Sequence, residues 1–183
     1  LTALSARCYA GLSDFGRAAE MYTEALSRNE DAVENYVALV DLLLKHPADV
    51  DLVQSDPKHR ENVEARQVAD ALMDAAVEKG KHRHRALLAR ARHLRAQGRL
   101  SEAARDIHAA LDLEADDADS LLEAVDIAMA QATELERVGQ AAEGQKLLDE
   151  AAAHIERGLT REPPDLRFYL ARSRMAIREG DGQ

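Results

Sequence analysis

Apolar residues recur every three to four positions along most of this chain, which is the spacing of an amphipathic α-helix. One frame returns four times: Ala, three residues, a large apolar residue, two residues, then a small residue followed by an apolar one. It occurs at 18–26, 69–77, 103–111 and 151–159, and its starts are 51, 34 and 48 residues apart. We predict a helix at each segment, with the frame on its buried face.

A second landmark repeats with the same spacing. Large residues stand at Tyr36, Leu87, Leu121 and Tyr169, which are again 51, 34 and 48 residues apart. Each is expected to begin a helix and to wedge against a neighbouring one. Because two separate landmarks share one set of spacings, the chain is predicted to be a series of helical hairpins, each with a first and a second helix.

These landmarks predict a single segment of four hairpins and one half, at about 1–32, 33–83, 84–117, 118–165 and 166–183. The second and fourth hairpins are longer than the other two, so alternate hairpins are expected to be elongated. The half repeat is expected to be a first helix that ends at a turn at Gly180 and Asp181.

The extra length falls between the first and second helix of each elongated hairpin. The first addition, which begins near His46, is expected to be a loop followed by a helix from about Pro57 to Lys79. The second, from Thr133 to Gln145, contains no proline and is expected to lengthen both helices into a protruding hairpin that turns near Gly139. Both additions are read as tolerated surface excursions; the alternative is that they form the edges of a binding groove or a self-association surface.

Composition agrees with helices and removes other classes. The chain has 35 Ala and only 3% aromatic residues, so β-sandwiches and β-barrels are excluded. The single cysteine, Cys8, excludes a disulfide scaffold and is expected to be a packing residue. The net charge of −10 argues against nucleic-acid binding. No apolar run approaches the roughly 18–20 residues that cross a membrane, and no signal peptide is visible; the compartment stays open, with the cytoplasm favoured.

With these features the chain resembles the tetratricopeptide repeat (TPR) family, whose motif is a 34-residue helix–turn–helix. The third hairpin carries the motif at Leu87, Ala91, Leu94, Gly98, Ala103, Ile107 and Ala110. Five of the six aromatic residues fall where the family has a large residue: Tyr9, Phe15, Tyr22, Tyr36 and Tyr169. Arg90 and Arg172 depart from it, since the motif prefers leucine there. The resemblance implies an all-α, right-handed superhelical solenoid of antiparallel helix hairpins, and a chain that is a fragment of a longer one.

In TPR solenoids the first helices line the concave surface, so the resemblance places a set of charged residues there. They are Arg7, Glu34, Asp41, Arg85, Arg92, Arg95, Asp119, Asp126, Arg167, Arg174 and Arg178. The sign alternates between successive first helices, which favours a ladder of ion pairs between neighbouring repeats. The alternative is a cationic stripe, with Arg95 and Arg178 as extra charges, that binds a carboxylate or an acidic peptide. The Lys/Asn carboxylate clamp of some TPR domains is not reproduced.

Candidate chemistry is sparse. Seven histidines occur, with His82 to His84 expected in a loop, but no zinc-binding spacing accompanies them. Phosphate-binding and nucleophile motifs are also missing from the sequence. We therefore expect no catalytic residues, no metal site and no cofactor, and we do not expect an enzyme.

The sequence thus favours a protein-interaction scaffold that binds a protein or peptide on its concave helical surface. The alternative is a homo-oligomerisation module, because apolar residues at the two ends, including Leu4, Leu170 and Ile177, would have no neighbours to pack against. A homodimer through these ends is the form that we expect such association to take. Neither a nucleic acid nor a membrane is expected as a partner.

Overall fold

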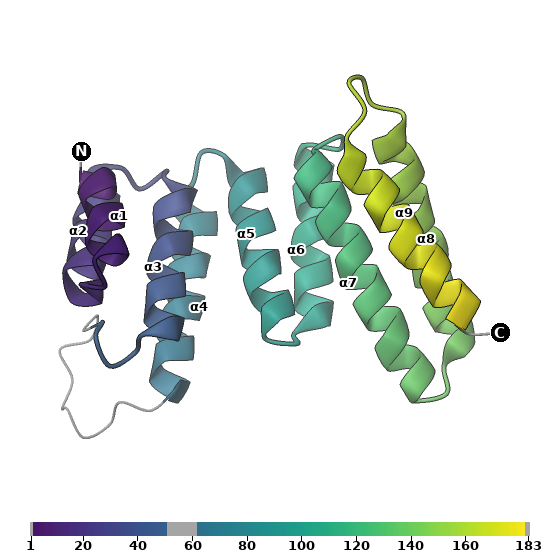
Figure 1. The fold of residues 1–183 in the computed structure, drawn as a ribbon, viewed down its shortest axis with the longest axis horizontal. Helices are drawn as coiled ribbons and strands as arrows, with labels where there is room; N and C mark the ends of the chain where they lie inside the picture. The colour runs from purple at the N-terminus through teal and green to yellow at the C-terminus, as the bar shows by residue number, and fades with distance from the viewer. Residues whose placement is uncertain (1, 51–61, 182–183) are drawn as a thin grey trace. The chain divides into compact units, whose positions relative to one another are not determined.

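The computed structural model describes residues 2–50 and 62–181, and within these ranges every regular element is an α-helix (Figure 1). The helices are α1 (Thr2–Gly11), α2 (Phe15–Arg28), α3 (Val33–Lys45), α4 (Asn62–Lys79), α5 (Arg83–Ala96), α6 (Leu100–Leu113), α7 (Ala118–Arg137), α8 (Ala141–Leu159) and α9 (Leu166–Asp181). The chain divides into two compact units, Leu1–Ala89 and Arg90–Gln183, and the boundary passes through α5.

In the first unit, consecutive helices from α1 to α4 pack against one another. The turn between α1 and α2 ends at Asp14, whose carboxylate accepts a hydrogen bond from the Arg17 backbone N–H at 3.3 Å and so caps α2. The end of α4 is attached to the α2–α3 connection by an ion pair between Lys79 and Glu30 at 2.9 Å. These contacts fix where the helices of the unit begin and end.

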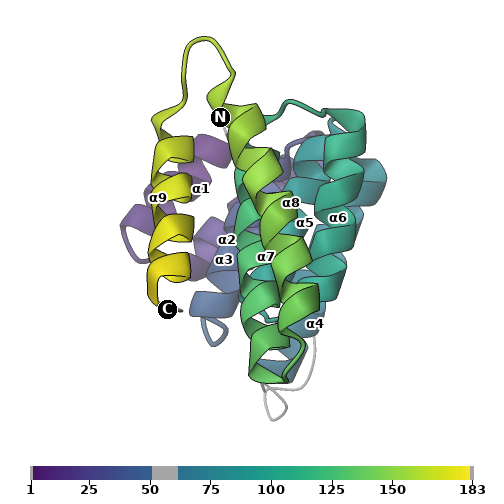
Figure 2. The ribbon, with the colours of Figure 1, turned by 90° about the vertical axis from the view of Figure 1, so that its right-hand side faces the viewer.

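In the second unit, α7 and α8 form a long hairpin against which α9 packs, as both ribbon views show (Figure 2). The hairpin turns at Gly139, whose φ of +81° lies in the left-handed region that glycine adopts without strain. Its core joins Val125 and Ala128 of α7 to Leu148 and Ile155 of α8. The predicted turn near Gly139 and the lengthening of both helices are confirmed.

The repeated frame is buried as predicted. The alanine that begins it is fully buried in all four second helices, at Ala18, Ala69, Ala103 and Ala151. A side chain larger than alanine at these points would push the paired helices apart, because the helices are in direct contact there. The frame therefore explains much of the high alanine content.

The large residue predicted to wedge against a neighbouring helix from each first helix is buried in three cases, and the prediction is wrong in the last. Tyr36, Leu87 and Leu121 are buried, but Tyr169 is 43% exposed. The residue that wedges into the core from α9 is its neighbour Phe168, which is fully buried. Phe168 fits because it faces Gly158 of α8, where even a Cβ atom would overlap the ring.

Three further expectations need correction, and one lies outside the described residues. Cys8 is exposed on α1, so it is not a packing residue. Helix α9 continues through Gly180 to Asp181, where a turn was expected. Helix α5 begins at Arg83, so His84 belongs to its first turn and not to a loop. Helix α4 ends at Lys79 as predicted, while its expected start near residue 57 falls in the range 51–61.

Candidate functional site

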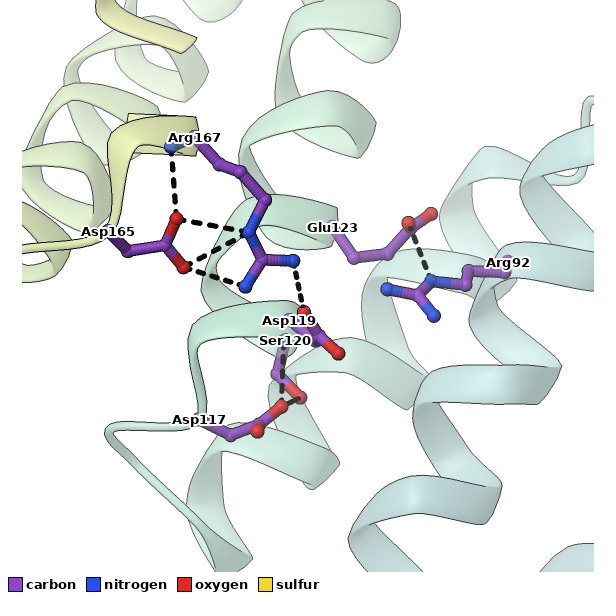
Figure 3. Close-up of polar contacts among 7 residues, drawn as sticks. All are labelled: Arg92, Asp117, Asp119, Ser120, Glu123, Asp165 and Arg167. Carbon is purple, nitrogen blue, oxygen red and sulfur yellow. Dashed lines mark hydrogen bonds and ion pairs between the residues drawn. The ribbon is translucent and has the colours of Figure 1, made fainter. Parts of the chain in front are cut away.

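The charged residues of α7 and α9 pair with one another in the second unit. Arg167 contacts Asp119, and Arg174 contacts Asp126 at 2.9 Å. Arg167 also holds Asp165, which precedes α9, so one guanidinium joins two carboxylates (Figure 3). These hydrogen bonds raise the pKa of Arg167 and, together with the Arg167 backbone N–H, lower the pKa of Asp165. Both pairs join residues 48 positions apart, which is the expected ladder between neighbouring first helices.

Two other predicted site residues meet a carboxylate that the sequence analysis did not select. Arg92 and Arg95 of α5 both contact Glu123 of α7. Arg92 Nε lies 3.3 Å from Glu123 Oε2, and Figure 3 shows this pair. The Glu123 side chain is only 4% exposed, whereas Arg92 is 49% and Arg95 36% exposed. The hydrogen bond to Glu123 raises the pKa of Arg95. The ladder therefore pairs Arg92 with Glu123, not with Asp126.

Arg178, the remaining arginine of the predicted cationic stripe in this unit, is also neutralised. Its Nη2 lies 2.7 Å from Glu136 Oε2 and 3.4 Å from Thr133 Oγ1, both near the end of α7. The five site arginines of the second unit thus each contact a carboxylate of the same unit. A carboxylate ligand would have to compete with these internal partners.

The first unit differs. Asp41 pairs with Lys45 one turn later on α3, at 3.1 Å, and so does not take part in a ladder. Arg7, Glu34 and Arg85 are exposed and have no ion-pair partner among the described residues. The structure therefore leaves these three charges available to solvent and to a ligand.

Two carboxylates that the sequence analysis missed are buried. Glu123 is one; the other is Asp106 of α6, which is 8% exposed and accepts two hydrogen bonds from Arg90, at 2.7 and 2.8 Å. This bidentate pair accounts for the arginine where the TPR motif prefers leucine. The burial of Glu123 could have been predicted from its spacing in the sequence. It lies three residues after Ser120 and four before Ile127, on the buried stripe of α7. An acidic residue on such a stripe needs a cationic partner.

A small cavity of about 20 Å³ lies between α6, α7 and α8, lined in part by His108, Glu150 and His154. His108 and His154 approach the same Glu150 oxygen, at 3.3 and 3.9 Å. Burial lowers the pKa of His154, and the Glu150 carboxylate opposes that effect only in part. Over the ranges 2–50 and 62–181, no three His, Cys, Asp or Glu side chains are placed to hold a metal ion.

Across the same described residues, no helix combines the length and the apolar character required to traverse a lipid bilayer.

No protein-family model matches this sequence, and none of the curated proteins matches it. Among solved structures, the fold is similar to that of "MamA MSR-1 C2", a TPR-containing protein, with a TM-score of 0.50. The two sequences are 16% identical over an alignment that covers 85% of this chain and 76% of that chain. At this identity the likeness concerns the fold alone, and it shows a TPR-like helical repeat fold.

Proposed function

We propose that this chain is a protein-interaction scaffold, and that the first helices of each unit carry its partner-binding residues. The proposed surface comprises the charged residues that the sequence analysis selected on these helices. Within it, the three exposed charges of the first unit that form no ion pair with any described residue contact the partner directly; they are Arg7, Glu34 and Arg85. The paired arginines of the second unit are already engaged by carboxylates of the same unit.

The observation that carries this proposal is the difference between the two units. Exposed ion pairs contribute only about 0–1 kcal/mol each, so stability alone gives little reason for a row of charges on the first helices. In the second unit those charges neutralise one another, whereas Arg7 and Arg85 keep open guanidinium groups that suit carboxylates of a protein or peptide. A TPR-like repeat presents an extended surface for such contacts.

The test is quantitative affinity capture from an extract of the source cells, followed by mass spectrometry. The variant Arg7→Glu/Arg85→Glu is compared with the parent chain and with Arg66→Glu/Arg105→Glu, a charge-matched control at exposed positions of the second helices α4 and α6. We expect specific partners to be lost only with the first variant. Equal recovery by all three proteins would refute the proposed surface. Arg92 and Arg95 are unsuitable for this test because their substitution also unpairs Glu123.

Self-association is the second candidate function, and the open face of α9 favours it. The ion pairs between α7 and α9 relate residues 48 apart. By the same spacing, Leu170 and Ile177 correspond to Leu122 and Met129, which pack against the α7–α8 core. On α9 the corresponding side chains are 66% and 64% exposed, so this face is apolar and uncovered.

Sedimentation velocity over a range of concentrations tests this candidate. The parent is expected to form dimers as its concentration rises, and Leu170→Glu/Ile177→Glu to remain monomeric. Leu113→Glu, at an apolar side chain of α6 that is 56% exposed, is the matched control. A parent chain that is monomeric throughout would eliminate self-association as a function of this face.

A further inference from the structure

A groove of about 260 Å³ lies where the second unit's long hairpin passes the beginning of α6. Leu100 and Ser101 line it from α6, and Leu147 lines it from α8. The end of α7 and its C-cap contribute Gln131, Glu134, Leu135, Arg137 and Val138. Figure 1 shows the α7–α8 turn extending beyond the end of α6 at which Leu100 lies. None of the charged residues that the sequence analysis selected on the first helices lines this groove.

The additional residues of the fourth hairpin form part of this groove. Helices α7 and α8 have 20 and 19 residues, against 14 in α6. The extension from Thr133 to Gln145 supplies Glu134, Leu135, Arg137 and Val138 to the lining. The elongation therefore provides one wall of a concave surface, as one of the two interpretations of the sequence expected.

The lining combines an apolar floor with a charged edge. Leu100 is buried and Leu135 and Leu147 are half-buried, while Val138 at the edge is 62% exposed. Arg137 is exposed and has no ion-pair partner among the described residues. The adjoining start of α6 has no side-chain cap, because the Arg99 side chain makes no capping hydrogen bond. Glu102, in the first turn of α6, is paired with Arg99 at 2.7 Å, and Arg137 is the basic residue of the groove lining.

We propose that this groove binds a short extended peptide segment of a partner protein, in which a large apolar side chain adjoins a carboxylate. The volume is below the roughly 300–1,000 Å³ of sites for drug-sized ligands, so it fits one or two side chains and not a cofactor. The apolar side chain packs on Leu135 and Leu147, and the carboxylate binds Arg137. Glu134, also exposed, accepts a hydrogen bond from a peptide N–H.

The probe is a random heptapeptide library displayed on phage and selected on the complete 183-residue chain. The most enriched peptide is then synthesised with a fluorophore, and its affinity is measured by anisotropy. We expect enriched sequences to place Leu, Ile, Met or Phe beside Asp or Glu. Affinity should fall by about tenfold or more with Arg137→Glu, which removes the ionic contact, and with Val138→Asp, which places a carboxylate at the edge of the apolar floor.

Two matched variants control for charge and for apolar surface elsewhere on α6. Arg105→Glu reverses an exposed charge, and Leu113→Asp replaces an exposed apolar side chain; both should bind the peptide like the parent. All four substitutions are at exposed positions, and circular dichroism melting verifies that each variant is folded. The proposal is overturned if no peptide is enriched over a selection without protein, if the groove variants bind as the parent does, or if the enriched peptides lack a carboxylate. None of these results would affect the proposal for Arg7 and Arg85.

Discussion

The cluster of Glu123 with Arg92 and Arg95 gives a quantitative test of how the second unit is held together. The burial of its members is unequal, because the carboxylate is 4% exposed and the two guanidinium groups are 49% and 36% exposed. Removing the carboxylate leaves cations that water can reach, whereas removing both cations leaves a buried charge without a partner. The two perturbations should therefore differ in cost.

For Glu123→Gln we expect a loss of about 1–2 kcal/mol in the free energy of unfolding, since charged hydrogen bonds are lost but the arginines can be solvated again. For Arg92→Met/Arg95→Met we expect about 3–5 kcal/mol, the cost of leaving one partner of a buried pair alone.

The assay is urea unfolding followed by circular dichroism at neutral pH. A triple variant, with Glu123→Leu added to the two methionines, is the control because it removes the whole ionic cluster. It should recover most of the lost stability, since well-packed apolar replacements of buried ion pairs are often neutral or stabilising. The reasoning is refuted if the double arginine variant costs no more than Glu123→Gln, or if the triple variant is as unstable as the double.

Three more predictions concern α8 and α9. Burial lowers the pKa of His154 below the usual 6.5, so the unfolded chain binds the proton first as the pH falls. The free energy of unfolding should therefore decrease below about pH 6.5, and His154→Gln should remove this decrease. Thermal melts of both proteins at pH 7.5 and 5.5 measure it. Gly158→Ala should destabilise the chain by up to about 2 kcal/mol, because overlap with Phe168 outweighs the gain in helix propensity. In a Phe168→Leu background the same substitution should stabilise the chain in urea unfolding. If it is still destabilising there, the proposed overlap is contradicted. Arg167→Met should cost no more than about 1 kcal/mol, and less in high salt, because its pair with Asp119 is half-exposed; a larger, salt-independent loss in thermal melting would show a different role.

The helical hairpins could be predicted because their signal is local. The frame that begins at Ala18 or Ala151 needs only the period of an α-helix and a requirement for small residues where helices touch. The turn at Gly139 is local in the same sense, since it follows from a helix-compatible run with a glycine at its middle. A TPR-like fold follows from several such hairpins at matched spacing.

The error at α9 has a different origin. Tyr169 and Phe168 are adjacent large aromatic residues, and spacing alone selected Tyr169. The choice depends on the opposite helix: Gly158 leaves room for a ring, and Phe168 is the residue that points toward it. Likewise, Tyr169 is exposed because no described helix covers that face of α9.

The sequence by itself determined which residues form helices, which helices pair, and that first helices carry charges of alternating sign. It also anticipated the pairs of Asp119 with Arg167 and of Asp126 with Arg174. Only the tertiary structure decided that Arg92 and Arg95 share the buried Glu123, and that Arg7 and Arg85 have no ion-pair partner in the part of the chain that the structure describes. The physical reason is the sequence distance over which each effect operates. Helix period and side-chain size constrain residues a few positions apart, but the partner of a long charged side chain depends on how separate helices pack in three dimensions.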